Sequence, residues 1–167
     1  MFLQLEVKPG KDVEQSRRKI FEELVKNDSQ VNNKTLSNFV KEAHFLAFLF
    51  IEGILVGTNA IKNNKPYQRT LEEKSAVKLP DTDFFGEVGY LHVEKDHRSA
   101  GLGDLLILGT LAAVRNEGLF ATIQTKNLSS RRLFERHGFM QVGKSWASKQ
   151  KDDRVNLYVR PGLKKSN

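Results

Sequence analysis

The segment from residue 84 to residue 125 limits what this chain can fold into more than any other part of it. An apolar strand, Phe84–Val93, is followed by a helix at 101–116 and by a second apolar strand, Leu119–Thr125. The helix is apolar nearly all round, which predicts that it is buried, and Gly118 lies where its C-terminal cap is expected. A strand, a helix and a strand in this order predict a parallel pair joined by a right-handed crossover.

Shorter elements flank this unit on both sides. Hydrophobic periodicity and turn residues predict further strands and helices, at 3–7 (strand), 13–25 (helix), 36–43 (helix), 45–51 and 54–61 (hairpin), 129–137 (helix), and 140–148 and 154–160 (hairpin). Lys62–Asp83 is polar and holds two of the four prolines, so it reads either as a flexible excursion beside a site or as a variable insertion. The resulting order, β-α-α-β-β-β-α-β-α-β-β, predicts an α/β chain with a mixed sheet.

Length and composition exclude several classes of protein. A chain of 167 residues predicts a single domain over 1–167. The absence of cysteine rules out disulfides, a thiol nucleophile and zinc sites with Cys ligands. The four histidines show no metal-ligand spacing, so no metal is expected. The apolar runs are far shorter than the ~20 residues that span a bilayer, and Met1–Gly10 does not resemble a signal peptide. We therefore expect a cytoplasmic protein without a membrane partner.

The net charge of +7 lies entirely in the C-terminal part of the chain. Residues 101–167 carry twelve basic and five acidic side chains, whereas the preceding residues are balanced. This excess is either an ordinary solvated surface or a local site for an anionic partner. Arg131, Arg132 and Arg136 form a basic face of the helix at 129–137, which suits a solvated surface, cofactor phosphates or an acidic acceptor.

The loop between the first strand and the buried helix has the features of a phosphate site. The backbone N–H groups at a helix start have no intrahelical acceptor and lie at the positive end of the helix dipole. Gly101 and Gly103 let the backbone approach an anion closely, and Arg98 adds a charged donor. The sequence lacks both the Gly-rich loop that ends in Lys-Ser/Thr and the three-glycine dinucleotide fingerprint.

Arg98–Gly103, followed at this distance by Asn127 and by Gly138-Phe139, resembles the paired acyl-coenzyme A motifs of the GNAT N-acetyltransferase superfamily. The resemblance implies a GNAT-like, mostly antiparallel mixed sheet with a parallel pair splayed at the cofactor site and about four helices. It also implies acetyl-coenzyme A as co-substrate. The cofactor contacts that it implies are Leu91, His92 and Val93 on the strand, Arg98, Ser99, Ala100, Gly101, Leu102, Gly103 and Asp104 at the loop and helix start, and Asn127 and Phe134 in the second motif.

Glu87 is the candidate general base. In relatives with a carboxylate base, that base lies on the strand about eleven residues before the loop, where Glu87 falls. The six steps of extended strand from Glu87 to Val93 span roughly 20 Å, so an extended pantetheine arm would bring its thioester near Glu87. Tyr90 and His92 point to the opposite face in a regular strand, but a bulge could reverse this. Phe134 occupies the position of a proton-donating tyrosine in many relatives, and phenylalanine cannot donate a proton.

These features predict an N-acyltransferase that moves an acetyl group directly to an amine of a small molecule or a protein. Two alternatives stay open. The acceptor could be a nucleic acid, such as a charged tRNA or a DNA base, and the basic C-terminal part of the chain supports this alternative. The chain could also be a catalytically inactive module that binds coenzyme A, and Phe134 in place of the proton-donating tyrosine supports this alternative. The last hairpin could pair across a homodimer, although nothing in the sequence requires it.

Overall fold

The computed structural model describes residues 1–28 and 31–163, which form two compact units. Unit 1 consists of residues 1–63 and 88–115, and unit 2 consists of residues 64–87 and 116 onward. Each unit has hydrophobic clusters of its own. Within the described residues, none of the helices combines the length and the apolar character needed to cross a membrane.

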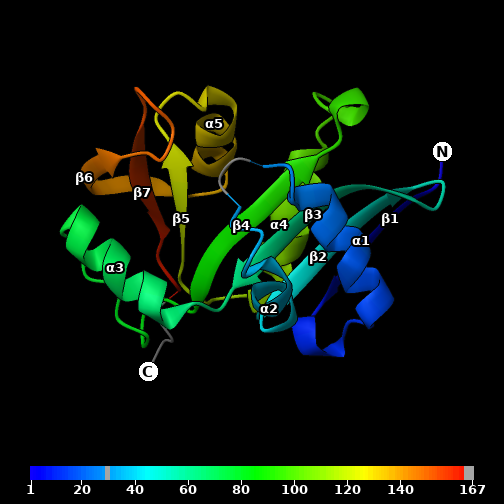
Figure 1. Ribbon diagram of the computed structural model, residues 1–167, viewed down its shortest axis with the longest axis horizontal. Coiled ribbons are helices and arrows are strands. Elements are labelled where there is room, and N and C mark those ends of the chain that lie inside the picture. The colour runs from blue at the N-terminus through cyan, green and yellow to red at the C-terminus, as the bar shows by residue number, and fades with distance from the viewer. Residues whose placement is uncertain (29–30, 164–167) are drawn as a thin grey trace. The chain divides into compact units, whose positions relative to one another are not determined.

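Seven strands form one mixed sheet in the order β1-β2-β3-β4-β5-β7-β6 (Figure 1). They are β1 (Leu3–Lys8), β2 (Phe45–Ile51), β3 (Ile54–Lys62), β4 (Gly86–Val93), β5 (Leu119–Gln124), β6 (Met140–Ala147) and β7 (Arg154–Arg160). β4 and β5 pair in parallel, with Gly86 opposite Leu119 and Glu87 opposite Phe120. The pairs β1-β2, β2-β3, β5-β7 and β6-β7 are antiparallel. The predicted fold class is therefore confirmed.

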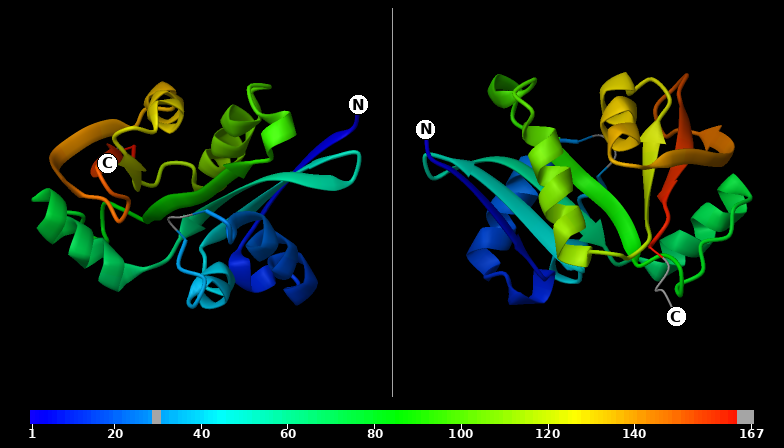
Figure 2. Two further views of the ribbon diagram at one scale, coloured as in Figure 1. Left: turned by 45° about the horizontal axis from the view of Figure 1, so that its top comes forward. Right: turned by 180° about the vertical axis from the view of Figure 1, so that it is seen from behind.

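In unit 1, helices cover both faces of the strands (Figure 2). A short 3-10 turn, η1 (Gly10–Asp12), precedes α1 (Gln15–Val25) and α2 (Leu36–Lys41), and α4 (Leu102–Val114) lies on the other face. Leu46 and Phe48 of β2 pack with α1 and α2, whereas Ala47 and Leu49 pack with α4. Because β2 is covered on both faces, its sequence is continuously apolar rather than alternating.

The helix after β4 was expected to be buried, and this holds for only one of its sides. Leu105 is 38% exposed and Leu108 is 53% exposed, because β1, β2 and β3 cover only one side of α4. The expected glycine cap was also wrong. The helix ends at Val114, its C-cap is Arg115 with a positive φ of 51°, and Gly118 has a different role. A Cβ at Gly118 would lie 2.0 Å from the backbone oxygen of Asp83, so only glycine fits there.

In unit 2, two helices lie on opposite faces of β5, β7 and β6 (Figure 2). Phe120, Leu157 and Val159 point to one face and pack with α3 (Lys65–Ser75) and the segment that follows it. On the other face, α5 (Leu128–Arg136) places Arg131 against Tyr158. The face that carries Phe120 also carries Glu87, because these residues lie opposite each other in the parallel pair.

Residues 62–83, interpreted from the sequence as a flexible excursion or a variable insertion, contain the helix α3, so the segment is not an irregular loop throughout. Asn64 caps the helix, with its Oδ1 accepting from the Tyr67 N–H at 3.2 Å, and Pro66 stands in the first turn. Both are N-terminal helix signals. The helix buries Leu71 but also the polar residues Gln68 and Ser75, so its apolar stripe is too thin to stand out as a periodic pattern.

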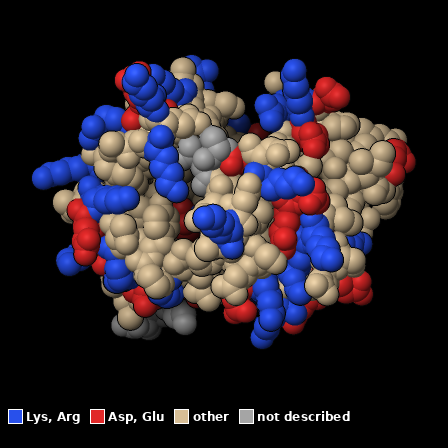
Figure 3. Space-filling view, viewed as in Figure 1, with Lys and Arg blue, Asp and Glu red and all other residues tan. Residues whose placement is uncertain are grey.

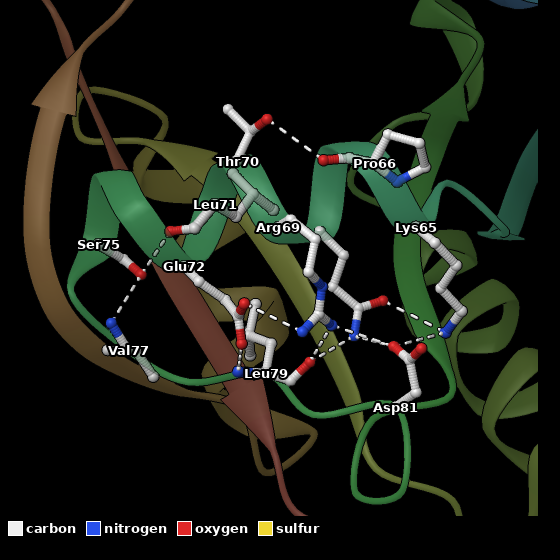
Figure 4. Close-up of polar contacts among 11 residues, drawn as sticks. Lys65, Pro66, Arg69, Thr70, Leu71, Glu72, Ser75, Val77, Leu79 and Asp81 are labelled. Atoms are coloured by element: carbon white, nitrogen blue, oxygen red, sulfur yellow. Dashed lines mark hydrogen bonds and ion pairs between the residues drawn. The ribbon is translucent and has the colours of Figure 1, made fainter.

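A polar network ties α3 to the segment that returns to β4 (Figure 4). The Gln68 amide donates to the Leu79 carbonyl at 2.6 Å and to Asp81 Oδ1 at 3.2 Å. Arg69 donates to the same two acceptors, and Lys65 forms an ion pair with Asp81 at 3.3 Å. Gln68 is only 1% exposed, and its hydrogen bond to the Leu79 carbonyl forms away from water.

We expect Gln68→Leu to destabilise the protein by about 2 kcal/mol, because it leaves the buried Leu79 carbonyl with one donor fewer. Thermal unfolding should show a melting temperature lower by roughly 4–8 °C. Glu73→Gln on the exposed side of α3 is the matched control and should shift it by less than about 2 °C. Equal melting temperatures for Gln68→Leu and the wild type would contradict a stabilising role for the network.

Candidate active site

In unit 1, β4 leads through a short exposed loop into α4. The 3-10 turn η2 (Lys95–His97) follows the strand, and residues 98–101 are exposed. Arg98 Nε donates to the Val93 carbonyl at 2.9 Å, which fixes the return of the loop. Ser99 and Gly101 both have positive φ, at 65° and 76°. The loop is therefore a defined turn that ends at the first residue of α4.

This loop has the chemistry of an anion cradle. The first helical residues, Leu102, Gly103 and Asp104, follow Gly101, which caps the helix without a side-chain hydrogen bond. The first backbone N–H groups of an α-helix point along the helix axis, away from the carbonyl groups of the helix. A Cβ at Gly101 would have no atom within 4 Å, so the glycine is required by its φ and leaves the approach open. Arg98, Ser99 and Ala100 stand exposed beside it. This arrangement fits a pyrophosphate group.

The end of β4 contains a break in strand alternation. A Cβ on Gly89 would lie 2.6 Å from Lys62 Cε, and Lys62 Nζ lies 4.9 Å from the centroid of the Tyr90 ring. Two consecutive residues thus face the same lysine, and Tyr90 has a φ of 55°. A regular strand alternates, so this is a bulge. Beyond it, Leu91 and Val93 pack toward α4.

The bulge changes which side chains share a face of β4. In a regular strand Glu87 and Tyr90 point to opposite faces, as expected from the sequence. Because alternation is interrupted at Gly89 and Tyr90, counting back from the bulge gives Glu87 the same face as Tyr90 and His92. The reversal that the sequence left open therefore takes place in this strand.

His92 lies at the same end of β4 and is half-buried. Burial is the main cause that lowers the pKa of His92 below its ordinary value. The negative charge of Glu94 raises the pKa, the positive charge of Arg98 lowers it further, and the negative charge of Asp28 raises it. The imidazole is therefore neutral at neutral pH.

The lowered pKa of His92 predicts that the free energy of unfolding decreases as the pH falls below about 6.5. The unfolded chain takes up the proton at that pH, whereas the folded chain takes it up only at a lower pH. His92→Gln should remove this part of the pH dependence. The measurements are urea unfolding at pH 7.5 and 5.5 and titration of the His92 ring by NMR. A titration midpoint at or above 6.5 would refute the prediction.

In unit 2, Glu87 is 4% exposed and lies at the start of β4. The hydroxyl of Thr122 on β5 donates to Glu87 Oε1 at 3.2 Å. A buried carboxylate needs hydrogen-bonded partners to remain charged. Glu87 thus combines burial with a defined donor, as a positioned acid–base group requires.

Two residues of the second motif have structural contacts in unit 2. Asn127 is the N-cap of α5, and its Oδ1 accepts from the Ser130 N–H at 3.1 Å. The amide nitrogen of Asn127 is a further donor. Phe134 is buried, with its ring 5.0 Å from that of Phe139 in an edge-to-face contact. It thus contributes to the core that holds α5 on the sheet.

The basic face of α5 is smaller than the sequence suggested. Arg131 Nε donates to the Tyr158 hydroxyl at 3.1 Å, and its Nη1 donates to the Thr125 carbonyl at 3.2 Å, so Arg131 is a structural residue. Arg132 is exposed. On the side drawn in Figure 3, Lys and Arg side chains are interspersed with Asp and Glu. The charge alone therefore does not identify a partner on this side.

Sequence reasoning missed Thr122 and Tyr158. Thr122 stands in an apolar strand, and its contact with Glu87 depends on which strands pair, which no local pattern reveals. Tyr158 likewise meets Arg131 across 27 residues of sequence. Within residues 1–28 and 31–163, no cluster of three His, Asp or Glu side chains could hold a metal ion.

Comparison with known proteins points to one family. The acetyltransferase (GNAT) family model matches residues 11–139. A search of curated proteins finds no match. Similar solved structures include the ribosomal-protein-S18-alanine N-acetyltransferase from Escherichia coli, with a TM-score of 0.71, 13% identity, and coverage of 98% of this chain and 97% of that chain. An acyl-CoA N-acyltransferase from Pseudomonas aeruginosa has a TM-score of 0.64 and 15% identity, with coverage of 95% and 99%. The chain therefore belongs to the GNAT acetyltransferase family.

Proposed function

We propose that this acetyltransferase moves an acetyl group from acetyl-coenzyme A directly to an amine of a small molecule or a protein. The observation that carries this proposal is the buried carboxylate of Glu87 on β4, the strand that leads to the phosphate cradle. The hydroxyl of Thr122 on β5 donates a hydrogen bond to this carboxylate. The GNAT family uses acetyl- or acyl-coenzyme A. The co-substrate supplies the acyl group as a reactive thioester.

Different segments of this chain bind different parts of the cofactor. Arg98 to Asp104 bind the pyrophosphate through backbone N–H groups and the Arg98 side chain. Leu91, His92 and Val93 offer backbone groups to the pantetheine arm. The family resemblance further implies Asn127 and Phe134 as cofactor contacts.

Glu87 takes the proton that the acceptor amine must lose. An ammonium group cannot attack a carbonyl until it is deprotonated, so a carboxylate within hydrogen-bond reach, or one water away, makes the amine a nucleophile. The chain has no cysteine that could carry an acyl group, which supports direct transfer without a thioester on the enzyme. With Phe134 in the tyrosine position, we assign protonation of the leaving thiolate to water.

Cofactor binding is the first test. At 100 times its Kd, acetyl-coenzyme A should stabilise the protein by about 2.7 kcal/mol, which corresponds to a rise in melting temperature of roughly 5–10 °C. Pantetheine, which lacks the pyrophosphate, should give a much smaller rise. Equal shifts with both ligands would contradict the assignment of the cradle, and no shift with acetyl-coenzyme A would contradict the proposal.

Turnover is the second test. Thiol release from acetyl-coenzyme A is followed with a panel of polyamines, amino acids, peptides and aminoacyl-tRNA. Because the chain has no cysteine, the protein adds no background to the thiol signal. Turnover with an amine supports the proposal. Turnover with tRNA alone would move the acceptor to nucleic acid, and binding without turnover would indicate an inactive module.

A further inference from the structure

We propose that Thr122 is a positioning residue that fixes the carboxylate of Glu87 for proton transfer. This inference rests on the proposed function, in which Glu87 is the base. The Thr122 hydroxyl donates to Glu87 Oε1 at 3.2 Å, from a half-buried side chain to a buried one. The sequence and the family match assign no role to Thr122.

Strand register explains why Thr122 meets Glu87. Glu87 lies opposite Phe120 in the parallel pair, and side chains on β5 alternate, so Phe120 and Thr122 share the face of Glu87. Thr122 is thus the next side chain along β5 on this face. On its other side, β5 pairs with β7, where Thr122 lies opposite Leu157. The Thr122 hydroxyl therefore extends from a strand that is held in place by regular antiparallel pairing with β7.

The contact provides orientation that Glu87 cannot supply alone. A glutamate side chain has three rotatable bonds, whereas the β-branched Thr122 has a restricted χ1. A hydrogen bond to a charged acceptor is stronger than one between neutral groups. Glu87 Oε1 can accept from the hydroxyl both before and after Glu87 takes a proton, so the carboxyl group keeps its orientation. During transfer the proton moves from the ammonium to Glu87, and Thr122 keeps its own hydrogen.

The first experiment removes the hydroxyl with almost no change in shape. Thr122→Val should lower kcat by about 10- to 30-fold, as expected for the loss of a hydrogen bond to a charged group. The KM for acetyl-coenzyme A should stay unchanged. Thr122→Ser keeps the hydroxyl and should stay within about 3-fold of the wild type. Valine suits a β-strand, so the Thr122→Val chain should fold, which equal melting temperatures would verify.

A double-mutant cycle separates positioning from a structural role. In a Glu87→Gln background, Thr122→Val should slow the reaction no further, because there is no base left to orient. Thr70→Val on α3 is the matched control and should leave kcat unchanged. If Thr122→Val lowers kcat by the same factor with and without Glu87, or if Thr122→Ser is as slow as Thr122→Val, the positioning role is refuted. Equal rates for Glu87→Gln and the wild type would instead refute the proposed base.

Discussion

Glu87→Gln should lower kcat by about 100- to 1,000-fold, the range expected when a general base is removed. Glutamine is similar in size and its side-chain oxygen can still accept from Thr122, so the fold should be preserved. The amide cannot take a proton at neutral pH, so the acceptor amine loses its base. Thiol release from acetyl-coenzyme A measures the effect.

Cofactor binding distinguishes a lost base from a damaged protein. The rise in melting temperature on addition of acetyl-coenzyme A should be the same for Glu87→Gln and the wild type, because the proposed phosphate cradle lies elsewhere on the chain. Glu117→Gln, at an exposed position between α4 and β5, is the matched control and should be fully active. A Glu87→Gln protein as fast as the wild type would remove Glu87 from the mechanism.

Gly118→Ala should have the largest effect on stability, a loss of about 3 kcal/mol. The added Cβ would lie 2.0 Å from the Asp83 backbone oxygen and 3.1 Å from the Gly162 nitrogen, and neither backbone atom can rotate away. The clash falls where Phe85 donates its N–H to the Gly118 carbonyl at 2.8 Å, just before β4. Chemical denaturation should show a lower midpoint.

Gly53→Ala is the matched control for this prediction. Gly53 lies in the turn between β2 and β3 with a φ of 78°, and a Cβ there would have no atom within 4 Å. Its replacement should therefore cost only the left-handed backbone penalty of about 1 kcal/mol. If Gly118→Ala costs no more than Gly53→Ala, close packing against Asp83 does not limit the substitution.

Elements with a strong local pattern could be predicted from the sequence. β2 has the bounds that its apolar run suggested, and the parallel pair follows from the order of strand, helix and strand. The helix α3 was missed because its buried side includes Gln68 and Ser75, whose partners lie in the following segment. The exposure of Leu105 and Leu108 was missed because hydrophobicity does not say how many neighbours surround a helix.

In the candidate site, too, local features could be predicted from the sequence and long-range contacts could not. A phosphate-binding role for the loop and helix start could be predicted from the sequence because glycine, arginine and a helix N-terminus act locally, and this role stays a prediction. The contacts of Thr122 with Glu87 and of Arg131 with Tyr158 could not be predicted, since each joins residues separated by 27 or more positions. A count of basic residues likewise overstates the charge available to a partner, because Arg131 already donates to Tyr158 and Thr125.

The bulge at Gly89 and Tyr90 makes the length of β4 as important as its composition. Deleting one residue there would restore alternation between the end of the strand and Glu87. Because Glu87 lies opposite Phe120 in the parallel pair, it would keep its place beside Thr122, and the side chains of β4 beyond the bulge would turn over instead, although every residue named in the mechanism would still be present. In a set of related sequences, the spacing between Glu87 and Arg98 would thus be a better guide to an intact site than the identity of either residue.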